Sequence, residues 1–320
     1  MRKVALGIAS LVLASSLQAM AQQWPAKPVK VIVPWAPGGA VDTATRKVAQ
    51  KLADQLGQPF VVENKPGASS TIGSQLVVNA PADGYTLVAN DMSYSLLPYV
   101  FKKLPFDHEK DLVPVSTTMI APYAIAVKAD SPHKTLQDLL KTAKASPGKL
   151  TYGTGGPGSA PHFATESLSM AANVDLLHVP YKGAADAMTA LIGGQIDVVM
   201  ASVPSLVAQV KGGKARILAV SGDKRLPALP DVPTFAEAGM KDWGILNFNG
   251  LWAPKGTPPA VIAKLQAEMA KVAAAPDVKA FFEGMGALPG GTKTEEFGKL
   301  VQTTTKNWGP VAAKANVEKQ

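Results

Sequence analysis

Short apolar runs alternate along the chain with longer segments in which apolar residues recur every three to four positions. In the first third, apolar runs at 29–33, 59–62 and 85–90 are separated by periodic segments at 41–56 and 69–78. Short apolar runs are typical of buried strands, and a period of about 3.6 residues indicates helices that pack through one face. Residues 29–90 therefore predict a β-α-β-α-β module with a parallel sheet.

The alternation stops between residues 91 and 122, a stretch that contains Pro98, Pro105 and Pro114, and then resumes. Beyond it we expect strands at 123–127, 150–152, 176–179, 196–200 and 216–220, with helices at 135–144, 159–172, 184–192 and 204–211. The interruption predicts a crossing into a second α/β domain.

After a proline-rich segment at 226–233, one more apolar run at 245–253 is followed only by helical periodicity, at 261–272, 278–285 and 294–308. Helices that have no strand left to accompany them must cover an existing sheet. We therefore expect one domain of residues 24–122 plus 250–320 and a second of residues 123–249. Each would be a mostly parallel sheet flanked by helices, and the two crossings would form a two-stranded hinge below a cleft.

The N-terminus has the pattern of a secretory signal peptide. Arg2 and Lys3 precede an apolar stretch at 4–17, and Ala19-Met20-Ala21 matches a signal peptidase site. The apolar stretch is shorter than the roughly 20 residues that a bilayer span needs. We expect residues 1–21 to be cleaved off after Ala21 and the mature protein to be exported.

Composition removes several classes of function. The 320 residues include no cysteine, which excludes disulfides, thiolate nucleophiles and cysteine-bound metals. The four histidines lack metal-ligand spacing, so neither a metal site nor a cofactor is expected. The formal charge is +8, but lysine and arginine are scattered rather than clustered, which argues against a nucleic-acid partner.

Glycine- and hydroxyl-rich segments follow several of the predicted strands. The two most prominent are 34–42 and 152–162, and shorter ones lie at 63–73, 179–183 and 201–204. Ligands of open α/β sheets bind outside the carboxyl ends of the strands, where helix N-termini attract anions. Each segment alone is compatible with a simple turn, but the set predicts two facing rims that bind an anion.

Two enzyme classes remain open as alternatives. Gly153, Gly155 and Gly158 match the GxGxxG dinucleotide motif. In dinucleotide-binding domains an acid that binds the ribose lies at the end of the next strand, whereas Asp175 lies before the next predicted strand. Ser159 could act as a nucleophile with His162 one helical turn later, although no GxSxG motif is present. A secreted α/β enzyme, either a serine hydrolase or a nucleotide-dependent oxidoreductase, is therefore the alternative to a binding protein.

From about Trp24 to the C-terminus, the chain resembles the substrate-binding receptors of tripartite tricarboxylate transporters, the Bug family. The resemblance rests on ordered blocks: VKVIVPWAPGGAVDTATR, ENKPGASSTIG, PADGYTL, LTYGTGGPGSAPH, VPYKGAADAMTALIGGQID, PDVPTFAEAG and LWAPKGTP. It implies a two-domain periplasmic-binding-protein fold, the Venus flytrap, without catalytic residues. Such a receptor would be a periplasmic monomer that binds a small carboxylate through backbone amides, hydroxyls and waters and delivers it to the permease subunits of a tripartite transporter.

Carried over position by position, the resemblance implies ligand-binding residues in both domains. Those of the first are Ala36, Pro37, Gly38, Gly39, Asp42, Gly67, Ser69, Ser70 and Thr71. Those of the second are Thr154, Gly158, Ser159, His162, Tyr181, Lys182, Gly183 and Ser202.

After the third strand this chain departs from the family. The family usually has small residues there, followed by Ser-Thr-His-like residues, whereas this chain reads Asn90-Asp-Met-Ser-Tyr94. Asp91 and Ser93 therefore join the candidates, and Asp91 would repel a carboxylate or attract an amine. We also expect valine at Gly39 or Gly158 to abolish carboxylate binding without unfolding the protein.

Overall fold

The computed structural model describes residues 24–181, 183–241 and 243–315, together with residue 319. The expected signal peptide and Lys182 lie outside the described residues.

The first part of the chain forms the predicted β-α-β-α-β module. Strand β1 (Val29–Val33) pairs in parallel with β2 (Phe60–Asn64) and with β3 (Thr86–Asp91). Helix α2 (Ala40–Leu56) connects β1 to β2, while the short helix η1 (Ala68–Ser70) and helix α3 (Thr71–Val78) connect β2 to β3. The carboxyl ends of all three strands therefore lie at one edge of the sheet.

The stretch at 91–122 is more regular than the sequence predicts. Two short helical segments, η2 (Met92–Leu96) and α4 (Leu97–Val100), are followed by the 17-residue strand β4 (Leu112–Lys128), of which only 123–127 was expected. The pairing register of β4 shifts between Pro114 and Ser116 and again between Thr117 and Met119. Such irregularities let a strand accommodate a proline, which otherwise argues against a strand.

The second half has its own sheet. Strand β5 (Thr151–Thr154) pairs in parallel with β6 (Leu177–Pro180) and β7 (Val198–Ser202), and β4 pairs antiparallel with β7 and with β8 (Ala215–Val220). The helices of this half lie close to their predicted positions: α5 (Leu136–Ala145), α6 (Ala160–Ala172), α7 (Ala184–Ile192) and α8 (Val203–Lys211).

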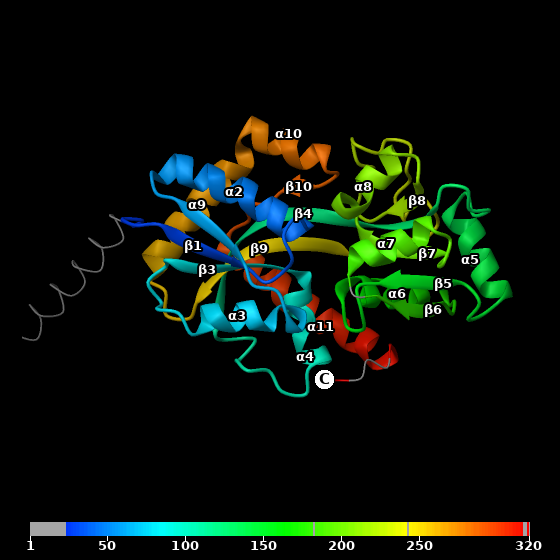
Figure 1. Cartoon of the computed structure of the whole chain (residues 1–320), viewed down its shortest axis with the longest axis horizontal. Helices are drawn as coiled ribbons and strands as arrows, with labels where there is room; N and C mark the ends of the chain where they lie inside the picture. The colour runs from blue at the N-terminus through cyan, green and yellow to red at the C-terminus, as the bar shows by residue number, and fades with distance from the viewer. Residues whose placement is uncertain (1–23, 182, 242, 316–318, 320) are drawn as a thin grey trace, which may run out of the picture.

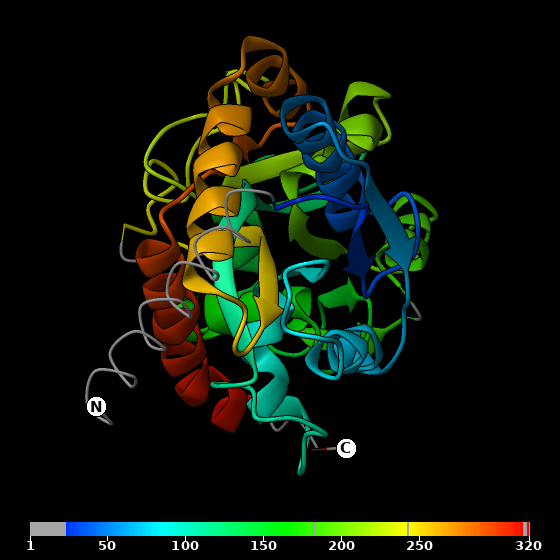
Figure 2. The ribbon, with the colours of Figure 1, turned by 90° about the vertical axis from the view of Figure 1, so that its left-hand side faces the viewer.

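The chain then returns to the first sheet. Strand β9 (Leu246–Pro254) lies between β3 and β4 and is antiparallel to both, as Figure 2 shows for the yellow β9 beside the cyan-green β4. It is followed by α9 (Pro259–Ala274), α10 (Pro276–Gly284), β10 (Leu288–Pro289), which pairs antiparallel with β4, and α11 (Thr294–Lys314). The α/β architecture is thus confirmed, but every pair that includes β4 or β9 is antiparallel, so both sheets are mixed.

Strand β4 runs from one half of the molecule to the other (Figure 1). Where it enters the second sheet, the Tyr123 amide donates to Ser221 Oγ at 2.8 Å and the Ser221 amide donates to the Tyr123 carbonyl at 2.7 Å. The Ser221 hydroxyl also donates to the carbonyl of Ile245, just before β9. Ser221 therefore joins the two segments that pass between the halves.

The C-terminal helices divide their contacts. Residues of α9 and α10 pack with α2 and the first sheet, as the sequence predicts. Helix α11 also reaches the second half, because Trp308 packs edge-on against Phe163 of α6 with ring centroids 5.7 Å apart. One apolar core accordingly contains residues of both halves.

Candidate ligand-binding site

The loop after β1 is held by Asp42, in the first turn of α2. The Asp42 carboxylate accepts hydrogen bonds from the Gly38 amide at 2.9 Å, from Arg46 Nε at 3.0 Å and from Asn64 Nδ2 at 2.8 Å. Burial disfavours the charge, but these hydrogen bonds outweigh it and hold the pKa of Asp42 below its usual range. Because its side chain is only 4% exposed, Asp42 positions the loop rather than offering a carboxylate to a ligand.

The residues that this loop presents are exposed backbone. Ala36, Pro37, Gly38 and Gly39 are all exposed, and Gly38 has a φ of 81°, which favours glycine. Gly39 is the N-cap of α2 and no side chain caps the helix. The first amides of α2 have no intrahelical acceptor, so they are available to an anion.

The loop after β2 has a strained backbone. Ala68, Ser69 and Ser70 have φ values of 43°, 50° and 79°, and they follow Gly67 at 135°. Consecutive non-glycine residues in this region are costly and occur where the surroundings enforce them, often at functional sites. Thr71 Oγ1 donates to the Ala68 carbonyl at 2.8 Å, which holds the turn and leaves the Ser69 side chain partly exposed.

Asn90 joins these loops, and sequence reasoning missed this role. Its fully buried side chain accepts from Trp35 Nε1 at 3.1 Å and donates to Ser70 Oγ at 3.0 Å and to Ser74 Oγ at 3.3 Å. The Asn90 side chain thereby connects the ends of β1, β2 and β3. An asparagine in an otherwise apolar strand was the available signal.

Asp91 is the last residue of β3, and Ser93 lies in η2, which follows it. The Ser93 amide donates to Asp91 Oδ1 at 2.9 Å. Burial raises the pKa of the Asp91 carboxyl to about 6, although the hydrogen bonds from Ser93 oppose the shift. The pKa of Tyr123 is raised by its burial and, secondarily, by the charge of Asp91, which indicates that this carboxylate lies near the crossing of β4.

In the second half, the loop between β5 and α6 bonds largely to itself. The Gly158 amide donates to His162 Nδ1 at 3.1 Å, and Ser159 Oγ donates to the Gly156 carbonyl at 2.7 Å. Ser159 and His162 therefore serve different partners, and the histidine is not placed to take the serine proton. This geometry removes the support for a Ser159 nucleophile.

Aromatic rings stack behind this loop. The rings of His162 and His178 lie 4.2 Å apart, and Tyr152 stacks on His178 at 4.9 Å. Burial, with a smaller contribution from His178, lowers the pKa of His162 to about 4. The buried Thr154 side chain bonds to His178 Nε2 at 2.6 Å. These side chains support the loop from inside.

The remaining candidates of the second half adjoin the same loop. The Tyr181 amide donates to the Thr154 carbonyl at 3.0 Å, and Gly183 is the N-cap of α7, which no side chain caps. Ser202 is the last residue of β7 and pairs with Tyr123 of β4, with its hydroxyl 3.2 Å from Ser205 Oγ. Lys182 lies outside the described residues.

The two halves meet beside the candidate loops. A Cβ placed on Gly158 would lie 2.7 Å from Val100 Cγ2 of α4, so the loop between β5 and α6 touches the first half here. Asp175 lies at the opposite edge, before β6, where its carbonyl accepts from the Gly148 amide at 3.1 Å. A ribose bound at the glycine loop could not reach Asp175, which disfavours dinucleotide binding.

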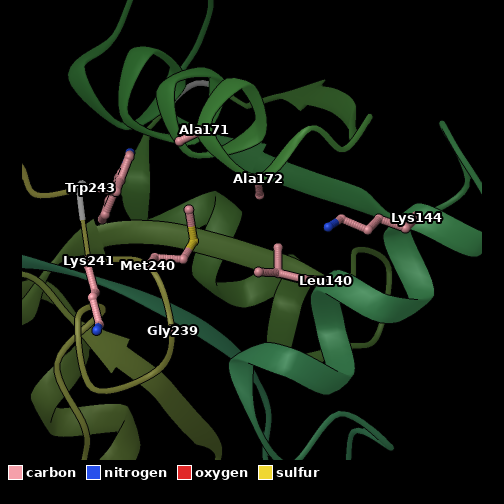
Figure 3. Close-up of a pocket in the computed structure, with 8 residues that line it drawn as sticks. All are labelled: Leu140, Lys144, Ala171, Ala172, Gly239, Met240, Lys241 and Trp243. Atoms are coloured by element: carbon pink, nitrogen blue, oxygen red, sulfur yellow. The ribbon is translucent and has the colours of Figure 1, made fainter.

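A surface pocket lies elsewhere, between α5, α6, residues 239–241 and Trp243 (Figure 3). It is lined by Leu140, Lys144, Ala171, Ala172, Gly239, Met240, Lys241 and Trp243, none of which is a predicted ligand-binding residue. Within the described part of the chain, no group of three acidic or histidine residues is arranged to hold a metal ion. The helices in these same ranges are too short or too polar to cross a bilayer.

Comparisons with known proteins agree with this architecture. The family model described as "Tripartite tricarboxylate transporter family receptor" matches residues 44–317. A UPF0065 protein from the tcbD-tcbE intergenic region of a Pseudomonas species is 37% identical over 96% of this chain and 92% of its own length. Protein BugT of Bordetella pertussis is 32% identical over 84% of this chain and 83% of its own.

Solved structures match over nearly the whole chain. One described as a periplasmic transporter has a TM-score of 0.84 and 38% identity, covering 92% of this chain and 99% of its own. Rpa4515 of R. palustris with adipate has a TM-score of 0.84 and 30% identity, covering 93% of this chain and 100% of its own. MatC of Rhodopseudomonas palustris with bound malate has a TM-score of 0.79 and 30% identity, covering 90% of this chain and 100% of its own.

Other matched structures are described as the periplasmic binding protein BugD and as a TctC solute binding protein from Polaromonas, and two of the matched structures hold a carboxylate. With its two mixed sheets joined by β4 and its glycine loops at the strand ends, the chain belongs to the tripartite tricarboxylate transporter receptor family.

Proposed function

We propose that the protein is a periplasmic receptor that captures a small carboxylate between its two halves and delivers it to the permease subunits of a tripartite tricarboxylate-type transporter. It acts as a monomer without a cofactor. Residues 24–122 plus 250–320 and residues 123–249 close on the ligand as two domains, in the hinge motion common to such receptors.

One observation carries the proposal: three helices start at the candidate loops without a side-chain cap. They are α2 after Gly39, α6 after Ser159 and α7 after Gly183. Helix α5, which starts away from these loops, has a complete capping box formed by Thr135 and Asp138, whereas α9 and α10 also lack a side-chain cap. What distinguishes α2, α6 and α7 is that they start at the glycine loops of the two halves. Uncapped N-termini from both halves offer amides to a carboxylate, and bound adipate and malate in related structures support the same ligand class.

The test is binding without turnover. Titration calorimetry against a panel of small organic acids should find stoichiometric binding of at least one acid, which is recovered unchanged. A ligand present at about 100 times its Kd should add about 2.7 kcal/mol to the free energy of unfolding. Chemical conversion of a bound acid would contradict a receptor role.

Export is tested separately. If the signal peptide is cleaved after Ala21, the protein recovered from the periplasm begins at Gln22. Recovery of a chain that still begins at Met1 would contradict cleavage.

A further inference from the structure

Asp91 is a carboxylate that the described chain does not neutralise. It ends β3 and is partly buried, and one oxygen accepts the Ser93 amide. Among the described residues, no lysine, arginine or histidine forms a salt bridge with it, whereas Asp42, in the first turn of α2, pairs with Arg46 at 3.0 Å. A carboxylate in such a position has the chemistry to bind a cation from outside the chain.

The residue opposite Asp91 has unused hydrogen-bonding groups. In the β3–β9 ladder Asp91 pairs directly with Asn249, so both side chains lie on the same face of the sheet. Asn249 is fully buried, and neither its Oδ1 nor its Nδ2 has a partner in the described chain. Asn247, two residues earlier on that face, also has an unpartnered Oδ1. Leaving buried polar groups unpaired costs free energy, and such groups are unusual outside functional sites.

The surroundings of Asp91 make its charge costly without a counter-charge. Burial raises its pKa to about 6, so at neutral pH the carboxylate is ionised in an unfavourable environment. Burial raises the pKa of the nearby Tyr123 of β4, and the Asp91 charge raises it further, while Ser93 of η2 donates its amide to Asp91. Neither supplies a positive charge.

We propose that the ligand carries an ammonium group in addition to its carboxylate, and that Asp91 binds this ammonium. The inference rests on the proposed function, since the carboxylate of the same molecule would bind at the uncapped helix N-termini. The ligand class is therefore a small amino carboxylate, and a second carboxylate at this position would be repelled by Asp91.

The experiment compares acids that differ only in an amino group. Titration calorimetry at pH 7.5 uses the pairs succinate and aspartate, glutarate and glutamate, propionate and β-alanine, and 4-methylbenzoate and 4-(aminomethyl)benzoate. For the pair that fits the site, the wild-type protein should bind the amino member at least about tenfold more tightly, which corresponds to about 1.4 kcal/mol. This comparison needs no variant.

Asp91→Asn then assigns the preference to the residue. The amide keeps an acceptor for the Ser93 amide but has no charge, so affinity for the amino member should fall at least about tenfold while affinity for the plain acid is unchanged or rises. Asp83→Asn, at a carboxylate 3.6 Å from Lys27, is the matched control and should change neither affinity.

The possible results separate the two proposals. Equal or tighter wild-type binding of the plain acids would overturn the ammonium site while leaving the carboxylate receptor intact. A preference for the amino member that survives in Asp91→Asn would also overturn the assignment to Asp91. Failure of every acid in the panel to bind would contradict the proposed function itself.

Discussion

The Gly158 amide donates a hydrogen bond to His162 Nδ1 at 3.1 Å, so the histidine ring holds the loop that precedes its own helix. The bond requires an unprotonated Nδ1, which places the ring proton of neutral His162 on Nε2. Protonation of Nδ1 would remove the only acceptor that the loop offers this amide in the described structure. The protonation state of His162 and the conformation of the loop between β5 and α6 are therefore linked.

Acid should destabilise the protein through His162. Its pKa is lowered from 6.5 to about 4, so the unfolded chain binds a proton first as the pH falls, and stability is lost between about pH 6.5 and pH 4. The loss amounts to at most about 3 kcal/mol. His178, whose pKa burial also lowers, contributes in the same direction.

The measurement is urea denaturation of wild type and of His162→Asn at pH 7 and pH 4.5. Asparagine keeps an acceptor but does not titrate, so the wild type should lose about 2 kcal/mol more than the variant between these pH values. Titrating groups that do not contact His162 cancel in this difference, whereas His178, which stacks on it, belongs to the same effect. Parallel pH profiles for the two proteins would contradict the assignment to His162.

Asp91 should change the stability with pH in the direction opposite to His162. Its pKa is raised from 3.8 to about 6, so the folded protein favours the protonated acid and loses stability as the pH rises from about 4 to 6. Asp91→Asn should therefore be more stable than wild type at pH 7.5, by up to about 3 kcal/mol, and nearly equal to it at pH 4. Thermal or urea denaturation at both pH values measures the difference, and a variant less stable than wild type at pH 7.5 would contradict a desolvated Asp91.

Asn90 should matter for both stability and binding, because it joins the ends of three strands. Asn90→Ala removes the acceptor for Trp35 and the donor to Ser70 and Ser74, and should cost about 2–4 kcal/mol in the free energy of unfolding. Trp35→Phe removes only one of these bonds and should cost about 1 kcal/mol. Urea denaturation distinguishes the two, and a neutral Asn90→Ala would show that the loops hold their shape independently.

The arrangement of elements was predictable because it depends on apolar periodicity, but the pairing of the crossing strands was not. Pro114 and Pro122 interrupt the apolar pattern of β4, and only the pairing with β9 shows that the strand continues through them. Likewise, the position of Gly158 next to a helix could be inferred, whereas the use of its amide by His162 could not, because side-chain geometry decides which amides stay free.

The sequence predicts the same effect for valine at Gly39 and at Gly158, but the two glycines differ in the structure. Gly39 has an extended backbone with a φ of −71°, and a Cβ there would meet only the Ala36 carbonyl oxygen, at 3.6 Å. Gly158 has a φ of 75° and would press against Val100. Valine at Gly158 is therefore expected to destabilise the fold, contrary to the expectation from sequence.

Gly39→Val is the informative variant. It should leave the melting temperature within a few degrees of wild type while weakening carboxylate binding at least about tenfold, because its side chain crowds the amides at the start of α2. The control variant is Gly244→Ala, because a Cβ added at Gly244 would meet no other atom within 4 Å. Unchanged affinity in Gly39→Val would place the anion elsewhere.

Ligand binding should bring the halves together, and Trp308 offers a local readout. Its indole packs on Phe163 with ring centroids 5.7 Å apart, so the contact between α11 and α6 spans the two halves. Closure about the segments joined by Ser221 must shift this contact, since β4 continues through both sheets while α11 is anchored on the first by Phe297. We expect a smaller radius of gyration by X-ray scattering when ligand is bound, accompanied by a change in tryptophan emission that Trp308→Phe diminishes. Scattering curves that are identical with and without a ligand shown to bind by calorimetry would rule out closure as the mechanism.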